Sequence, residues 1–272
     1  FFFKQKTAYE IPKRDWSSDV CSSDLTNIHS RSYSHIIRNI YNVPRDEFNK
    51  IHDTREIISM AASIGRYYDQ LHVINCRREL GDRVSDTEHV RAIWLALNAS
   101  YALEAFRFMV SFATSLAMVE NRMFIGNGNI ISLILQDEIL HRDWTAWIIN
   151  QVVKEDPRFA RAAKSCEAEV YAMYREVIQE EKSWADYLFS RGPVIGLNAN
   201  ILKDFVDFTA TAALREIGIK YTEPAPRSTP IPWFRKHVDT HKKQTALQEN
   251  ESVSYVIGVM SDTVDYNKLP NI

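Results

Sequence analysis

The sequence is poor in the residues that interrupt helices or staple small folds. Of its 272 residues, only eight are glycine and three are cysteine. Cys21, Cys76 and Cys166 form neither a CxxC pair nor a disulfide framework, which argues against a disulfide-stapled secreted domain. They fit a reducing, cytoplasmic location. Together with long stretches of helical periodicity, the scarcity of glycine favours an all-α fold.

Neither sign of charge dominates the chain, because 33 Lys and Arg residues face 35 Asp and Glu residues. This balance gives no reason to expect a nucleic acid or a membrane surface as a partner. The longest apolar stretch, residues 108–119, is interrupted by Ser111, Thr114 and Ser115 and is too short to span a bilayer. We therefore expect no nucleic-acid and no membrane partner, and a chain long enough to bury a large core.

Residues 1–25 differ from the rest of the chain. They show neither the period of a strand nor that of a helix. Three Phe residues followed by Lys-Gln-Lys do not form the apolar core of a signal peptide. The string resembles translated sequencing-adapter read-through, and a natural disordered leader is the alternative. We interpret residues 1–25 as a non-native leader standing where the natural N-terminus is missing.

Helical periodicity begins at residue 26 and defines the expected domain. It predicts helices over residues 26–41, 55–75, 86–124, 130–154, 158–181 and 198–217. Pro44, the Gly-Asn-Gly segment at 126–128 and Pro157 are the expected breaks, and Asp86 is an expected helix cap. We expect one helical domain over residues 26–234 and a flexible tail over residues 235–272.

One helix face carries an acid and an imidazole among apolar side chains. Glu138 and His141 are three residues apart and therefore project from the same face, with Ile134 one turn earlier. Burying a carboxylate is costly unless it is paired or bound to a metal. A single Glu-x-x-His step also arises by chance on solvated helices, so its meaning depends on partners elsewhere in the chain.

Two other predicted helices supply such partners. Glu104 starts a stripe that continues with Phe108 and Phe112, so it too is an acid on an apolar face. His29 and Tyr33 lie four residues apart on another helix; each alone fits an ordinary core residue with a satisfied polar atom.

Packing of these helices brings the acids together. Helices joined by a short Gly loop pack antiparallel, so Glu104 and Glu138 can face each other in the core. Two close carboxylates repel, and a bound cation removes that conflict. With His29 and His141 as nitrogen ligands, the set suits iron or manganese and makes up most of a di-iron carboxylate site.

From about Thr26 to Ile272 the chain resembles the small, radical-generating subunit of class I ribonucleotide reductase. The resemblance is carried by IHSRSYSHIIRNIY (28–41), LEAFRFMVSFATS (103–115), ISLILQDEILH (131–141), WADYLF (184–189), IGLN (195–198), PIPWF (230–234) and SYVIG (254–258). It implies a ferritin-like helical bundle around two iron ions, with manganese possible. It also implies an oxidoreductase of deoxyribonucleotide synthesis that serves DNA replication.

The resemblance assigns roles to particular residues. The implied metal ligands are His29, Glu104, Glu138 and His141. Tyr33 matches the radical tyrosine, and its apolar pocket matches Phe108, Phe112 and Ile134. The residues that match the radical-transfer path are Asp137, Glu249 and Tyr255.

The resemblance further implies a homodimer and a large partner subunit on which the C-terminal tail docks. In the implied mechanism, two reduced metal ions react with O₂ and Tyr33 is oxidised by one electron and one proton. The radical then passes through Asp137 and His29 to Tyr255 and on to the large subunit, where ribonucleotides are reduced.

Two departures from the family pattern leave alternatives open. The family has a glutamate where this chain has Thr26, and a hydroxyl is a poor substitute for an anionic ligand. The family's Asp ligand and Trp relay would fall in the part occupied by residues 1–25. With four of six expected ligand residues present, a different ferritin-like di-metal oxidase, an iron-binding protein or a metal-free helical scaffold are the alternatives.

Overall fold

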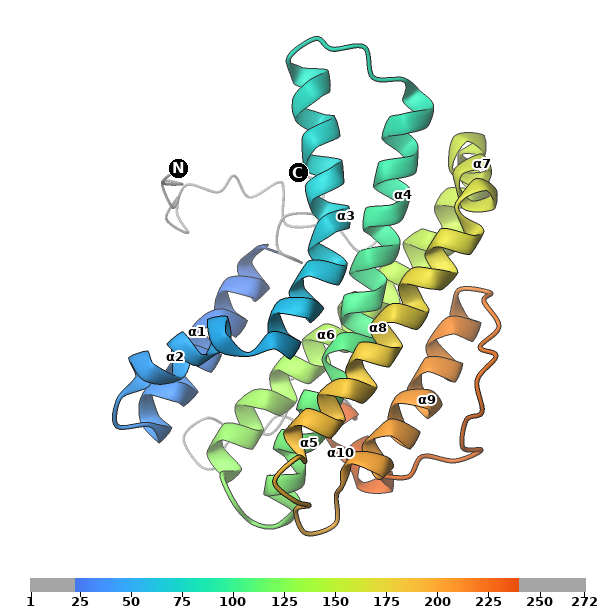
Figure 1. The fold of residues 1–272 in the computed structure, drawn as a ribbon. Helices are drawn as coiled ribbons and strands as arrows, with labels where there is room; N and C mark the ends of the chain where they lie inside the picture. The colour runs from blue at the N-terminus through green and yellow to red at the C-terminus, as the bar shows by residue number, and fades with distance from the viewer. Residues whose placement is uncertain (1–22, 240–272) are drawn as a thin grey trace, which may run out of the picture.

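The structure is a computed structural model that describes residues 23–239, with side chains placed from residue 27 onward. Within that part of the chain every named element is helical, which confirms the predicted all-α class (Figure 1). The elements are α1 (Ser23–Ile40), α2 (Pro44–Asp53), α3 (Arg55–Glu79), α4 (Asp86–Ala102), the π-helical turn η1 (Leu103–Arg107), α5 (Met109–Glu120), α6 (Ile125–Glu155), α7 (Pro157–Ser165), α8 (Glu167–Leu188), α9 (Ala199–Glu216), the 3-10 turn η2 (Pro232–Phe234) and α10 (Arg235–Val238).

The segment made of α4, η1 and α5 forms the spine of the bundle. It packs against α3, α6, α8 and α9, so it has neighbours on every side (Figure 1). At its centre the rings of Tyr101, Phe106 and Tyr174 meet edge to face, with centroids 5.8–6.2 Å apart. These rings are fully buried, and each contributes a large apolar area to the core of the bundle.

The reversal between α5 and α6 differs from the prediction. Gly126 and Gly128 lie inside the first turn of α6, so the expected break at residues 126–128 is wrong. The chain reverses earlier, where Arg122 and Phe124 adopt positive φ angles of 58° and 52°. A Cβ at Gly128 would lie 2.0 Å from Val119 Cγ2, so this glycine permits the close approach of α5 and α6.

Other boundaries also depart from the periodicity. Pro44 occupies the first position of α2, where its missing N–H costs nothing, so it begins a helix as well as separating two. The predicted helix over 158–181 is two helices, divided at Cys166, and α8 runs on to Leu188. The N-cap of α4 is Ser85, whose Oγ accepts from the Glu88 amide, and not Asp86.

The described residues include one helical stretch, Asp86–Glu120, that is long and apolar enough to cross a membrane. More than half of its most apolar window, 56%, is buried inside the bundle. Burial of this kind is expected for the core helix of a bundle, which is apolar all round because it has neighbours on all sides.

Candidate metal centre

One cavity of about 300 Å³ collects most of the residues singled out in the sequence. Three segments of the chain supply its lining: α1, the η1–α5 region and α6. The predicted ligands and pocket residues that line it are His29, Tyr33, Glu104, Phe108, Phe112, Ile134, Glu138 and His141. Residues separated by up to 112 positions in the sequence therefore meet at one site, as the helix faces predicted.

Glu138 lies at the centre of the polar part of the cavity. Its Oε1 is 3.0 Å from Nδ1 of His29, and its Oε2 is 3.6 Å from Nδ1 of His141. Burial alone would raise the pKa of Glu138, but hydrogen bonds and charge from His141 and His29 outweigh burial and lower it. The carboxylate is therefore ionised, and it faces two nitrogen atoms of the kind that bind metals.

His29 is held from both sides of its ring. Its Nε2 lies 2.9 Å from Asp137 Oδ2, while Nδ1 faces Glu138. Burial lowers the pKa of His29, but the hydrogen bonds that its ring donates to the Asp137 and Glu138 carboxylates prevail and raise the pKa to about 9. A carboxylate on one imidazole nitrogen fixes the ring orientation and leaves the other nitrogen directed at the site.

Glu104 approaches from the opposite wall. The hydroxyl of Thr145 donates a 2.8 Å hydrogen bond to its Oε2. Burial raises the pKa of Glu104 to about 7, and the charge of Glu138 adds to this, while Thr145 and His141 act against it. Sequence reasoning missed Thr145, although it lies four residues after His141 and hence on the same face of α6.

Tyr33 lines the same cavity from α1. Tyr33 is 40% exposed, so one side of the residue faces outward. Burial of the phenol and the charge of Glu138 nevertheless raise its pKa to about 12. Phe108 and Phe112 meet edge to face with centroids 6.1 Å apart, and together with the buried Ile134 they form the apolar wall.

The π-helical turn η1 is a second feature that periodicity did not predict. In an α-helix, side chains three residues apart share a face. Here Glu104 reaches Thr145 on α6, whereas Arg107 bonds Ser63 on α3 and Glu180 on α8. The wider turn directs these two side chains to opposite sides of the helix, and π-helical turns of this kind are frequent at functional sites.

The donors fit iron or manganese by chemistry, since two carboxylates and two imidazoles are the ligand types that such ions take. They are paired with one another: Glu138 contacts both His29 and His141. Among the described residues, no group of three or more His, Cys, Asp or Glu side chains is already arranged to coordinate a metal ion. Metal uptake therefore requires Glu138 to exchange its imidazole contacts for metal contacts.

Three predicted positions lie beyond the placed side chains. Glu249 and Tyr255 fall outside residues 23–239, so their part in the radical path stays a prediction. Thr26 belongs to α1 by its backbone, but its side chain is not among those described.

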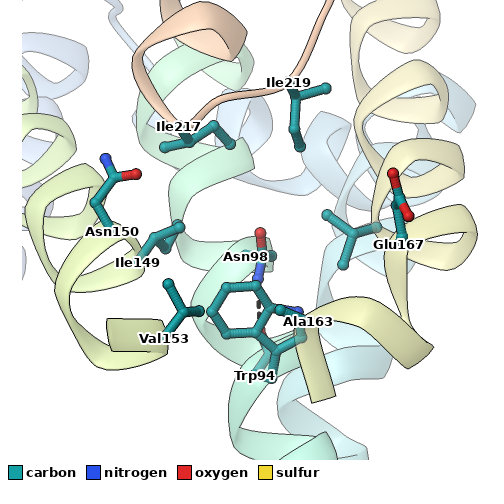
Figure 2. A pocket seen from close by; sticks show the side chains of 10 residues that line it. Trp94, Asn98, Ile149, Asn150, Val153, Ala163, Glu167, Ile217 and Ile219 are labelled. Atoms are coloured by element: carbon teal, nitrogen blue, oxygen red, sulfur yellow. Dashed lines mark hydrogen bonds between the residues drawn. The ribbon is translucent and has the colours of Figure 1, made fainter. Parts of the chain in front are cut away.

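A separate cavity of about 200 Å³ lies between α4, α6, α7, α8 and the segment after α9 (Figure 2). Its walls are mainly apolar, with Trp94, Val153 and Ile219 among them. The Asn98 amide is already committed, because it accepts from the Tyr174 hydroxyl at 2.6 Å and donates to the Trp94 carbonyl at 2.8 Å. None of the predicted site residues lines this cavity.

Comparison with known proteins places the chain in a family. A family model described as "Ribonucleotide reductase, small chain" matches residues 24–225. The chain is 39% identical to the ribonucleoside-diphosphate reductase subunit beta of Haemophilus influenzae over 256 residues, 88% of this chain and 67% of that one. It is 33% identical to the subunit beta of Enterobacteria phage T4, over 88% of this chain and 67% of the relative.

Solved structures agree on the fold. A ribonucleotide reductase R2 subunit from Clostridium botulinum superposes with a TM-score of 0.66 at 20% identity, covering 78% of this chain and 62% of that one. At this identity the likeness concerns the fold alone, and it confirms the expected ferritin-like helical bundle. The chain spans about two thirds of the length of these relatives. By the family model and its relatives, it belongs to the ribonucleotide reductase small-chain family.

Proposed function

We propose that the chain acts as the small subunit of a ribonucleoside-diphosphate reductase and generates a radical on Tyr33 beside a two-metal centre. One observation carries the proposal. His29, Glu104, Glu138 and His141 line a single cavity together with Tyr33. A tyrosine beside four metal-ligand side chains is the arrangement that radical generation needs, and it goes beyond what metal storage needs.

These four side chains would hold two iron ions, with manganese as the alternative, and the ions with O₂ would supply the one-electron oxidising power. Asp137 would keep the His29 ring oriented by accepting from its Nε2–H at 2.9 Å. Ligation through Nδ1 requires the proton on that atom to leave, because His29 has a pKa of about 9 before metal binds.

Tyr33 keeps its phenolic proton at neutral pH, because its pKa is about 12. Its oxidation therefore removes a proton together with an electron. Phe108, Phe112 and Ile134 would exclude water and reductants from the cavity side of the ring and so prolong the life of the radical. The protein thus supplies positioning and exclusion of water around chemistry that belongs to the metal ions.

The hydrogen-bonded pair of His29 and Asp137 leads out of the cavity and supports a role in radical transfer. We assign the continuation to Glu249 and Tyr255 in the tail. Because α10 (residues 235–238) packs on the bundle, we assign docking on the large subunit, where ribonucleotides become deoxyribonucleotides, to the tail after it. A homodimer and a cytoplasmic location belong to the same proposal.

An electron paramagnetic resonance spectrum after addition of Fe(II) and O₂ to the full chain tests the radical. We expect a tyrosyl signal that disappears in Tyr33→Phe, while iron uptake measured by a colorimetric chelator is unchanged. Tyr187→Phe, an exposed tyrosine on α8, is the matched control and should keep the signal. A signal that persists in Tyr33→Phe would contradict the assignment.

Removal of residues 250–272 separates a reductase subunit from another ferritin-like oxidase or an iron-binding protein. We expect the truncated chain to keep the Tyr33 radical and to lose ribonucleotide reduction with a cognate large subunit. Undiminished reductase activity after truncation would remove the tail from the mechanism.

A further inference from the structure

The turn that carries Glu104 is held from behind by a buried polar cluster. Nη2 of Arg107 donates to Glu180 Oε2 at 2.6 Å and to Ser63 Oγ at 2.8 Å. The Ser63 hydroxyl in turn donates to Glu180 Oε2 at 2.7 Å. One charged network therefore joins η1 to α3 and α8, on the side of the spine away from the cavity.

Glu181 adds a second attachment at the end of the same turn. Its side chain is fully buried, with 0% of the residue exposed, and its Oε2 accepts from the Val110 amide at 3.4 Å. Val110 is the second residue of α5, directly after the change from π-helical to α-helical geometry. Helix starts leave N–H groups without partners in the helix, and here a side chain of α8 supplies the acceptor.

Burial favours the neutral form of the Glu181 carboxyl group. Burial raises its pKa well above the usual range, and the charges of Arg107 and Glu180 act in opposite directions on it. A neutral carboxyl group still has a carbonyl oxygen for the Val110 amide. Glutamine would keep that acceptor, whereas leucine would fill the space without it.

Stability alone does not account for this cluster. Glu181 Oε1 and Arg107 Nε and Nη1 are buried without a hydrogen-bond partner among the described residues. Buried ionic groups with unsatisfied atoms stabilise a fold less than apolar side chains of similar size would. The geometry that the cluster imposes on η1 is the feature that an apolar cluster would not supply.

We propose that Arg107 and Glu181 are positioning residues that fix the π-helical turn so that the Glu104 carboxylate faces Glu138 and His141 across the cavity. Arg107 holds the turn toward α3 and α8, and Glu181 holds its junction with α5. The inference rests on the proposed function, because that function makes Glu104 a metal ligand.

Titration of the full chain with Co(II), followed by the visible absorption of the bound ion, tests the role. We expect Glu181→Leu to weaken Co(II) binding at least ~10-fold and to shift the bands, as loss of ligand-orienting groups does. Glu181→Gln should restore binding. Val170→Ala is the control, because it makes a hole on the same helix about three turns away without touching η1.

The outcomes separate this inference from the proposed function. No Co(II) binding by the unsubstituted chain would overturn the proposed function. Normal binding there, with equal binding by Glu181→Leu, would overturn the positioning role alone.

Amide hydrogen exchange tests the anchoring of η1 and the start of α5 without any metal. Exchange at residues 108–112 should quicken in Glu181→Leu and stay unchanged in Val170→Ala. Equal rates in Glu181→Leu and the unsubstituted chain would overturn the anchoring role.

Arg107→Lys serves if Glu181→Leu does not fold. It keeps the charge but replaces the guanidinium fork with one nitrogen. Weaker Co(II) binding in this variant would support the role, and unchanged binding would overturn it.

Discussion

The two walls of the cavity are built in different ways. The wall from η1 and α5 is backed by α8 and α9 and by the buried rings of Phe106 and Tyr174. The wall from α1 packs mainly against α6 and α2 (Figure 1), and Ile28 on α1 is 54% exposed. Glu104 therefore sits on a rigid support, and Tyr33 sits on a helix with little apolar burial.

The difference shows two ways to place a functional side chain. On the rigid wall, apolar packing fixes the backbone, and a polar cluster adjusts one turn. On α1, the contacts of His29 with Asp137 and Glu138 hold the helix in place, where apolar packing is sparse. The charged groups of the site therefore also hold the backbone of α1, whereas apolar packing holds the wall from η1 and α5. Removing a site charge should loosen α1 and leave α5 unchanged.

Among variants of the two walls, Glu138→Ala should change metal affinity and amide exchange the most. It removes the carboxylate that faces both His29 and His141, so we expect metal affinity to fall by ~100-fold or more, beyond the loss typical of outer ligand-orienting groups. We also expect faster amide exchange across α1 but not across α5. Co(II) titration and hydrogen exchange measure both. Glu176→Ala, an exposed acid on α8, is the control; equal protection of α1 in Glu138→Ala would contradict the tethering role.

Truncating a buried side chain on each wall tests the same difference through the free energy of unfolding. Phe106→Ala on the rigid wall should lower the free energy of unfolding by about 3–5 kcal/mol, because it leaves a cavity in the ring cluster. Ile36→Ala on α1 should cost only about 2 kcal/mol, the low end for its type, because a loosely packed helix can shift into the gap. Urea denaturation gives both values. Equal costs would mean that α1 is as firmly packed as the spine.

The sequence predicted which residues meet but not how the backbone presents them. The faces that carry His29 with Tyr33 and Glu104 with Phe108 follow from periodicity, since spacing alone determines a helix face. The all-α class follows from the same signal. Local spacing alone predicts both features, because local spacing and long-range packing agree in this chain.

The remaining features depend on contacts between distant segments. The π-helical turn leaves no mark in spacing, because Glu181 and Glu180, more than 70 residues further on, support it. The close approach of Gly128 to Val119 likewise belongs to the pairing of two helices. Thr145 had a signal in its spacing from His141, but a threonine on a helix face has many ordinary explanations.

Metal uptake should also depend on pH, with a smaller effect than the substitutions above. Before metal binds, the pKa of His29 is about 9 and that of Glu104 about 7, so ligation must displace protons below those values. We expect Co(II) affinity to rise with pH from about 6 to 9 and then to level. A Co(II) affinity that does not change over that pH range would contradict the release of protons on ligation.

The same pKa of His29 predicts a stability effect in the metal-free chain. Because the folded value is raised from 6.5 to about 9, its contribution is fully present below about pH 6.5 and is lost as pH rises through 9. Between about pH 6.5 and 9, amide exchange across α1 should therefore speed up by more than the increase that the intrinsic exchange rate shows with pH. Asp137→Asn, which removes a carboxylate partner of His29, should reduce the excess.

The smallest effect is expected for a polar contact on the rigid wall. Lys236 Nζ lies 2.6 Å from Glu120 Oε1 and joins α10 to the end of α5. Burial would raise the pKa of Glu120, but Lys236 and His237 lower it, so its contribution is present above the ordinary value of 4.5 and is lost as pH falls through the folded value.

Because the Lys236 side chain is 49% exposed, Lys236→Met should cost less than about 1 kcal/mol at pH 7, and the difference should shrink in high salt. Urea denaturation at two salt concentrations measures it, with Lys50→Met in the exposed pair with Glu47 as a control. Apolar packing already fixes this wall, so a charged contact has little left to stabilise. A loss as large as that of Phe106→Ala would mean that polar contacts carry the rigid wall too, and the contrast between the two walls would fail.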